Sequence, residues 1–272
     1  MSPASSRPGT ARLIALDIDG TLLAPGASAN ALPDPAITAA VRAHIAAGTT
    51  VVLATGRMFP GTIGIAEHLG IESPLICQQG ASIHEHSGAL AAQHCIDPGL
   101  ARDIAGYAHA NGWELAWFDA QRYLVTALHP AAEHFAQLSG VTAEIHSAPE
   151  RSGIAPIGVD IISSATEALG IHDELADRYG ERVQLIDFST VTAAYHPVAT
   201  KGASIAALAE ARSIAPEEVV AIGDSANDAS MLRWAGFGAS PEHCDRYARG
   251  AADEILAGHG VSGVAQLLED LL

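Results

Sequence analysis

Unbroken apolar runs that alternate with helical stretches constrain the fold of this chain most strongly. The first run opens LIALDIDGTLL, residues 13–23, and the second is TVVLAT, residues 50–55. Between them, PDPAITAAVRAHIAAG predicts a helix, because Ile37, Val41 and Ile45 lie four residues apart and a glycine follows. Uninterrupted apolar runs are typical of parallel strands covered on both faces. With a further short helix and the strand PLICQQG, this order predicts an α/β fold with a doubly wound, Rossmann-like parallel sheet.

The middle of the chain, residues 82–189, follows a different pattern. WELAWF (113–118) and YLVTAL (123–128) are separated by a short connection, which predicts an antiparallel hairpin. An α+β pattern is completed by helical stretches near 98–110, 130–138 and 164–179 and by strands at 157–162 and 183–186. The strand–helix alternation then resumes with TKGASIAALAEARS and EVVAIGD. We therefore predict a core formed by residues 1–81 and 190–272, interrupted by an inserted α+β domain at residues 82–189.

Charge and cysteine usage narrow the partners and the location. The formal net charge is −17, from 14 Lys plus Arg against 31 Asp plus Glu, which argues against nucleic acid or an anionic membrane as partner. No apolar run reaches the roughly 18–20 residues of a bilayer span. The start, MSPASSRPGTAR, lacks an apolar segment and is expected to be a short flexible lead. Cys77, Cys95 and Cys244 are expected to be free thiols, which favours a cytoplasmic location. The sequence does not determine the oligomeric state.

Two carboxylates follow the first apolar run directly. Asp17 and Asp19 are two positions apart, so continued strand alternation would place them on one face. Like charges at that spacing repel each other unless a positive charge lies between them. Mg²⁺ is a candidate because it prefers hard oxygen ligands. Taken alone, the pair is also compatible with a solvated acidic turn.

Four short motifs lie where open α/β sheets place their sites, at the carboxyl ends of core strands. They are DIDGT at residues 17–21, TGR at residues 55–57, Lys201 at the start of a helix, and IGDSAND at residues 222–228. Each motif alone is a weak signal, since a turn or a solvated lysine explains it. Together, in this order and each at a strand end, they are a highly specific signal.

The four motifs resemble those of the haloacid dehalogenase superfamily and, within it, the Cof-type phosphatases. The resemblance covers nearly the whole chain, because that subfamily carries a large α/β cap domain between the second and third motifs. It implies a Mg²⁺-dependent phosphatase that hydrolyses a small phosphorylated metabolite, a sugar phosphate or similar phosphomonoester. The reaction would pass through an aspartyl-phosphate intermediate, and residues of the cap, 82–189, would select the substrate.

The resemblance also assigns roles to individual residues. Asp17 would be the nucleophile and Asp19 the general acid and base, with Lys201 as the third catalytic residue. The implied phosphate-binding residues are Gly20, Thr55, Gly56, Lys201 and Asn227. The implied magnesium ligands are Asp17, Asp224 and Asp19, the last through its backbone carbonyl. Asp228 is expected to orient Lys201 rather than touch the metal, and Arg57 to support its loop, with a phosphate contact as the alternative.

Two positions depart from the pattern of the resembled subfamily. Gln79 stands where an asparagine is common. After the fourth motif, Ser240 and Pro241, expected in a loop near the site, stand in the neighbourhood where Gly-Asn-Ala is common. We interpret both as tuning of the site rather than loss of catalysis. Two other functions remain open: a phosphomutase of the phosphomannomutase type, and a catalytically silent module that binds a metabolite.

Overall fold

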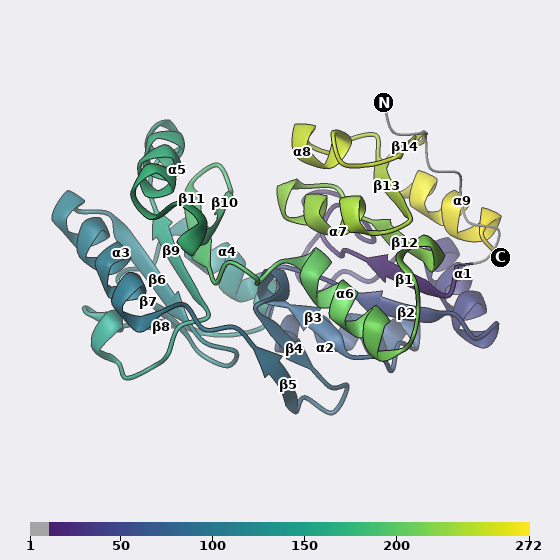
Figure 1. Ribbon diagram of the computed structural model, residues 1–272, viewed down its shortest axis with the longest axis horizontal. Coiled ribbons are helices and arrows are strands. Elements are labelled where there is room, and N and C mark those ends of the chain that lie inside the picture. The colour runs from purple at the N-terminus through teal and green to yellow at the C-terminus, as the bar shows by residue number, and fades with distance from the viewer. Residues whose placement is uncertain (1–10) are drawn as a thin grey trace.

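A five-stranded parallel sheet forms the core of the protein, whose structure, a computed structural model, describes residues 11–272 (Figure 1). The strand order is β14-β13-β12-β1-β2, with every neighbouring pair parallel. Its strands are β1 (Leu13–Leu16), β2 (Thr50–Leu53), β12 (Val219–Ile222), β13 (Phe237–Pro241) and β14 (Glu254–Leu256). The predicted doubly wound α/β fold is confirmed. The expected N-terminal lead lies outside the described residues, apart from residues 11 and 12.

Helices cover both faces of this sheet, which explains the unbroken apolar strands. Ile14 and Leu16 of β1 pack toward one face and Leu13 and Ala15 toward the other, all fully buried. The first face is covered by α1 (Pro35–Ala46), α2 (Phe59–Leu69) and α9 (Ser262–Asp270). The second is covered by α6 (Lys201–Ala211), α7 (Ala229–Trp234) and α8 (Arg246–Arg249). The start of α1 is set by Asp34, whose carboxylate accepts from the Ala36 N–H.

The strand PLICQQG is only a marginal member of the core sheet. β3 (Leu75–Cys77) touches β2 through one parallel bridge, Ala54 to Ile76. Its main partner is β4 (Ser82–His84), which pairs antiparallel with β3 and with β5 (Leu90–Gln93). The three-stranded sheet β3-β4-β5 was not predicted, because β4 and β5 are too short to give a clear alternation.

A six-stranded sheet, in the order β10-β11-β9-β6-β7-β8, forms a second body of structure (Figure 1). Its strands are β6 (Glu114–Phe118), β7 (Tyr123–Val125), β8 (Ala143–Ile145), β9 (Gly158–Ile162), β10 (Gln184–Asp187) and β11 (Val191–Tyr195). The predicted hairpin is the antiparallel pair of β6 and β7. One face is covered by α3 (Pro98–Asn111) and α5 (Ala165–Tyr179), and the other packs on α4 (Pro130–Ser139) and on core residues.

The division of the chain at residues 81/82 and 189/190 stays a prediction. β11 begins at Val191 and pairs with β9 and β10 inside the six-stranded sheet.

Short 3₁₀ turns lie at Gln78–Gly80, Pro149–Arg151, Gly180–Arg182, Pro216–Glu218 and Ala226–Asp228. Among residues 11–272, the structure has no helix that is both long and apolar enough to cross a bilayer.

Candidate active site

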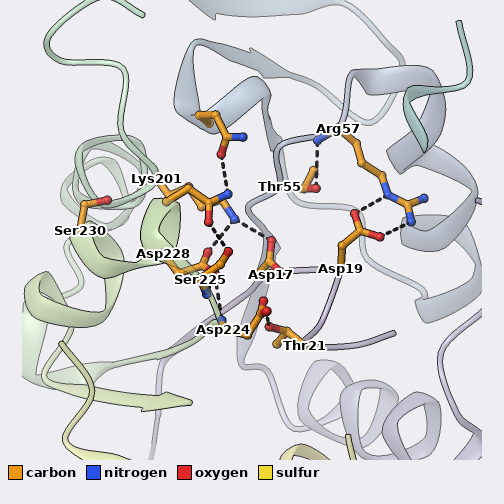
Figure 2. A network of polar contacts seen from close by, with 12 residues as sticks. Asp17, Asp19, Thr21, Thr55, Arg57, Lys201, Asp224, Ser225, Asp228 and Ser230 are labelled. Carbon is orange, nitrogen blue, oxygen red and sulfur yellow. Dashed lines mark hydrogen bonds and ion pairs between the residues drawn. The ribbon is translucent and has the colours of Figure 1, made fainter. Parts of the chain in front are cut away.

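Side chains from all four motifs converge at the carboxyl edge of the core sheet. Asp17 follows β1, Thr55 follows β2, Lys201 opens α6, and Asp224 follows β12 (Figure 2). The strands that end there are adjacent and parallel, so their final residues meet at one edge. Parallel pairing therefore joins motifs that are far apart in the sequence.

Lys201 is the centre of a buried ion-pair network. Its side chain is fully buried, and Nζ donates to Asp17 Oδ1 and Asp228 Oδ1, each at 2.6 Å. Burial opposes the charged form, but the attraction of the two carboxylates outweighs it and raises the lysine pKa. Lys201 is also the only lysine in the chain. It therefore holds a permanent positive charge beside Asp17.

Three carboxylates share this single ammonium. Asp17, Asp224 and Asp228 each offer an oxygen within 4.8 Å of the others. Burial raises the pKa of Asp17 well above its ordinary value, and the neighbouring Asp228 charge adds to the shift despite Lys201. Burial and Asp228 likewise raise the pKa of Asp224 to about 7. The ionised cluster carries two uncompensated negative charges, which is the balance that a divalent cation would neutralise.

Asp228 and Asp224 differ in how their oxygens are used. Asp228 Oδ1 accepts from Lys201, and Oδ2 accepts from the N–H groups of Asp224 and Ser225 at 3.0 Å each. Asp228 therefore orients Lys201 and the loop after β12. Asp224 Oδ1 accepts from the Thr21 hydroxyl at 3.3 Å, while its Oδ2, like Asp17 Oδ2, accepts no hydrogen bond from residues 11–272. These two free oxygens suit a hard metal ion.

Asp19 has a different counter-charge from the one expected. The strand ends at Leu16, so alternation does not place Asp19 beside Asp17. Instead, Arg57 donates from Nε and Nη2 to the two oxygens of Asp19 at 2.8 and 2.6 Å. Arg57 Nη1 also donates to the carbonyls of Ala29 and Gly61 at 3.2 Å. Arg57 thus fixes the Asp19 loop and supplies Asp19 with a positive counter-charge that the sequence did not indicate.

The side chain of Gln79 occupies the space beside Gly56 of the second motif. It has a left-handed backbone (φ 64°), and its Nε2 lies 2.5 Å from where a Cβ at Gly56 would stand. Its Oε1 accepts from Asn227 Nδ2 at 2.7 Å, and Asn227 Oδ1 accepts from the Ser225 hydroxyl at 2.6 Å. The fully buried Thr55 accepts from the Arg57 N–H through its hydroxyl oxygen. Gln79 therefore links the second and fourth motifs, a role that its type alone did not reveal.

The segment around Ser240-Pro241 is a strand rather than the expected loop. Both residues lie in β13, where they pair with β14. The chain beyond β13 returns to the site, since His243 Nε2 lies 2.7 Å from the Gly20 carbonyl oxygen. Sequence analysis missed His243, because a lone histidine carries no spacing signal.

A cavity of about 410 Å³ opens from this site toward the six-stranded sheet. Asp17, Asp19 and Asn227 line it from the core, and Tyr123, Asp160 and Tyr195 line it from β7, β9 and β11. A small molecule at Asp17 would therefore contact both sheets.

Residues 14–268 match the sequence profile of haloacid dehalogenase-like hydrolases. The chain belongs to this family. It is 28% identical to a phosphoglycolate phosphatase of Natronomonas pharaonis, covering 94% of this chain and 96% of the relative. It is 27% identical to phosphatase YwpJ of Bacillus subtilis, covering 96% and 100%. The sequence-based assignment to the Cof-type phosphatases is confirmed, and the protein is a phosphoric monoester hydrolase.

Solved structures share the fold of this haloacid dehalogenase-like hydrolase. A family member from Bacteroides thetaiotaomicron superimposes with a TM-score of 0.82 at 22% identity, covering 97% of this chain and 100% of the other. A member from B. subtilis gives 0.81 at 24% identity, covering 96% and 100%. The match over both sheets identifies the α/β architecture as that of the family.

Gly20 lets this hydrolase bring Asp224 close to the first motif, which leads to a testable prediction. Gly20 has φ +89°, and a Cβ there would lie 2.3 Å from Asp224 Oδ2. We expect Gly20→Ala to displace Asp224 and to lower kcat/KM at least about 100-fold, with about 1–2 kcal/mol of backbone strain. Gly26→Ala is the matched control, because Gly26 also has a positive φ (+75°) but has nothing within 4 Å of the added methyl. Equal loss of activity in both variants, measured by steady-state kinetics, would contradict the steric argument.

Proposed function

We propose that this enzyme is a Mg²⁺-dependent phosphatase that hydrolyses a small phosphorylated metabolite through an aspartyl-phosphate on Asp17. One observation carries the proposal: Asp17 keeps a free carboxylate oxygen at the cavity while buried Lys201 holds its other oxygen. A carboxylate positioned in this way can act as a nucleophile. The names of the two curated relatives support a phosphatase, and a structural neighbour is described as a sugar phosphatase.

The residues present fit a magnesium ion. The proposed ligands are the free oxygens of Asp17 and Asp224 and the backbone carbonyl of Asp19, with Asp228 held back by its own hydrogen bonds. The bound ion would offset the repulsion between the Asp17 carboxylate and an incoming phosphate dianion.

The first half-reaction transfers the phosphoryl group to Asp17. Its free carboxylate oxygen forms a bond to phosphorus as the bond from phosphorus to the leaving oxygen breaks. Asp19 donates a proton to that leaving oxygen, so the product departs as an alcohol. In the structure the Asp19 carboxylate accepts two hydrogen bonds from Arg57. Protonating the leaving oxygen therefore requires Asp19 to give up Arg57 and contact the substrate instead.

The second half-reaction restores the enzyme. Asp19 takes a proton from water, the water oxygen bonds to phosphorus, and the bond from phosphorus to the Asp17 oxygen breaks to release inorganic phosphate. We assign Lys201, the Thr55 hydroxyl, Asn227 and the backbone beside Gly20 and Gly56 to the phosphoryl oxygens. The positive charge of Lys201 and the hydrogen-bond donors of the other groups would stabilise the negative charge that develops on the phosphoryl oxygens.

Metal dependence is the direct test of this proposal. We expect hydrolysis of p-nitrophenyl phosphate with millimolar Mg²⁺ and a loss of at least about 100-fold after chelation, because two negative charges then oppose the substrate. Asp224→Asn should weaken the response to Mg²⁺, measured as the concentration giving half-maximal rate. Full activity in chelator would contradict the metal role. No hydrolysis of any phosphomonoester would favour the silent binding module, and an isomerised phosphorylated product would indicate a phosphomutase.

The proposal extends to the substrate-selecting body and the location. Residues 82–189 supply much of the cavity wall, with Tyr195 of β11 adding to it, which supports a role of residues 82–189 in substrate choice. The cytoplasmic location expected from the cysteines stays a prediction.

A further inference from the structure

A buried carboxyl of the six-stranded sheet lies without a partner beside the cavity. Asp160 is central in β9, where it pairs with Ala193 of β11 and Ala116 of β6. The residue is 6% exposed, and its Oδ1 is buried with no hydrogen-bond partner among residues 11–272. Such a group is costly to bury, and its presence in a folded protein requires an explanation.

The pleat of β9 directs Asp160 toward the active site. Its neighbours Val159 and Ile161 pack into the cluster beneath α3 and α5, so Asp160 points to the opposite face. That face carries Tyr123 and Tyr195, and Asp160 lines the same cavity as Asp17. The carboxyl and the proposed nucleophile therefore face one ligand space.

Aromatic side chains surround Asp160, and no cation of residues 11–272 pairs with it, since Arg57, which lines the same cavity, is paired with Asp19. Tyr123, Phe135 and Tyr195 line the cavity with it. Burial is the one cause that raises the pKa of Asp160 to about 8, and no neighbouring positive charge opposes the shift. A carboxyl that served only stability would be paired within the chain. The missing partner is therefore expected to come from the ligand.

We propose that Asp160 is a specificity-determining residue that accepts a hydrogen bond from a hydroxyl or ammonium group on the leaving part of the phosphomonoester. This inference rests on the proposed phosphatase function, because a phosphoryl group at Asp17 places the leaving group in this cavity. The aromatic rings would contact its carbon skeleton. A leaving group without a donor leaves Asp160 unpaired, and one with a carboxylate meets a like charge when Asp160 is ionised. Phosphoglycolate, which appears in the name of one relative, is thus expected to be a poor substrate here.

The test compares a panel of esters with p-nitrophenyl phosphate as reference. Glycerol 3-phosphate, ribose 5-phosphate and glucose 6-phosphate supply hydroxyls, ethanolamine phosphate an ammonium, propyl phosphate no donor, and phosphoglycolate a carboxylate. The highest kcat/KM of the wild type is expected among the esters that carry a donor. Asp160→Leu should lower the ratio of that kcat/KM to the value for p-nitrophenyl phosphate by about 10- to 100-fold.

Asp160→Asn separates the two kinds of donor. The amide oxygen of Asp160→Asn can still accept a hydrogen bond from a hydroxyl. If the ligand group is a hydroxyl, the kcat/KM ratio should therefore fall less in Asp160→Asn than in Asp160→Leu. If the ligand group is an ammonium, Asp160→Asn removes its counter-charge, and the kcat/KM ratio should fall as much as in Asp160→Leu. Either pattern supports the proposal and identifies the donor.

Stability distinguishes this role from a structural one. Asp160→Leu should raise the melting temperature by about 2–4 °C, because it replaces an unpaired buried carboxyl with an apolar group of similar size. If Asp160 had only a structural role, the melting temperature of Asp160→Leu should instead be lower than that of the wild type. Glu144→Gln is the control. Glu144 is partly exposed on β8 of the same sheet and pairs with Arg122, so the kcat/KM ratio of this variant should stay at the wild-type value.

Three results would overturn the assignment of Asp160. They are phosphoglycolate or propyl phosphate as the best substrate, an unchanged ratio in Asp160→Leu, or a lowered melting temperature in that variant. A wild-type enzyme that hydrolyses neither p-nitrophenyl phosphate nor any ester of the panel would instead overturn the proposed function itself.

Discussion

Replacing Asp17 with asparagine is expected to lower kcat on the order of 10⁴-fold while leaving the metal-free protein at least as stable as the wild type. An amide is a poor nucleophile for phosphorus, so the aspartyl-phosphate cannot form. The fold should tolerate the change, because the amide oxygen can still accept from Lys201 Nζ. Removing one charge also relieves the repulsion from Asp228 and Asp224.

The stability effect of Asp17→Asn should depend on pH. Burial and neighbouring carboxylates raise the pKa of Asp17 well above its ordinary value of 3.8, so the folded state binds this proton more tightly than the unfolded state. The stability of metal-free wild type therefore falls as pH rises above about 4, and the asparagine variant lacks this contribution. Melting temperatures in chelator should diverge in favour of Asp17→Asn as the pH rises above about 4.

Asp177→Asn provides the matched control for both measurements. Asp177 is exposed on α5, away from the cavity, so its loss should change neither kcat nor the pH dependence. Retained activity in Asp17→Asn would show that another group attacks phosphorus. A variant that melts below the wild type at pH 8 would show that the carboxylate stabilises the metal-free fold.

Replacing Lys201 with methionine is expected to damage both stability and catalysis. The change leaves Asp17 and Asp228 buried without their ammonium, which should lower the free energy of unfolding by about 3–5 kcal/mol. It also removes the positive charge at the proposed phosphate site, so kcat/KM should fall on the order of 10³-fold. Chemical denaturation and steady-state kinetics measure the two effects.

Two further variants separate charge from geometry. Lys201→Arg keeps the charge but replaces a compact ammonium between two carboxylates, 2.6 Å from each, with a planar fork. We expect it to recover part of the stability and little of the activity. Adding Asp228→Asn to Lys201→Met removes one unpaired charge, so the double variant should be more stable than Lys201→Met alone. Additive losses in the double variant would contradict a coupled pair.

The convergence of Asp17, Lys201 and Asp224 could be predicted from the sequence. Each follows an apolar strand or opens a helix, and parallel strands in one sheet deliver their carboxyl ends to the same edge. The hairpin of β6 and β7 was equally accessible, because two apolar runs flank a short connection.

Side-chain partners across the fold could not be predicted. Arg57 was expected to support its loop, yet nothing in the sequence indicated that it pairs with Asp19 rather than with a backbone group alone. The direction of Gln79 over Gly56 depends on a left-handed backbone that a glutamine rarely adopts. The antiparallel β3-β4-β5 sheet also escaped prediction, since β4 and β5, with three and four residues, are too short to give a clear alternation.

The sequence by itself determined the family, the core sheet and the carboxylates and lysine at its edge, because apolar periodicity and motif order are local properties of the chain. Only the tertiary structure decided which charges neutralise each other and that Asp160 faces Asp17 across a shared cavity. The physical reason is that burial, counter-charge and hydrogen-bond partners arise from groups that are distant in sequence and brought close only by folding.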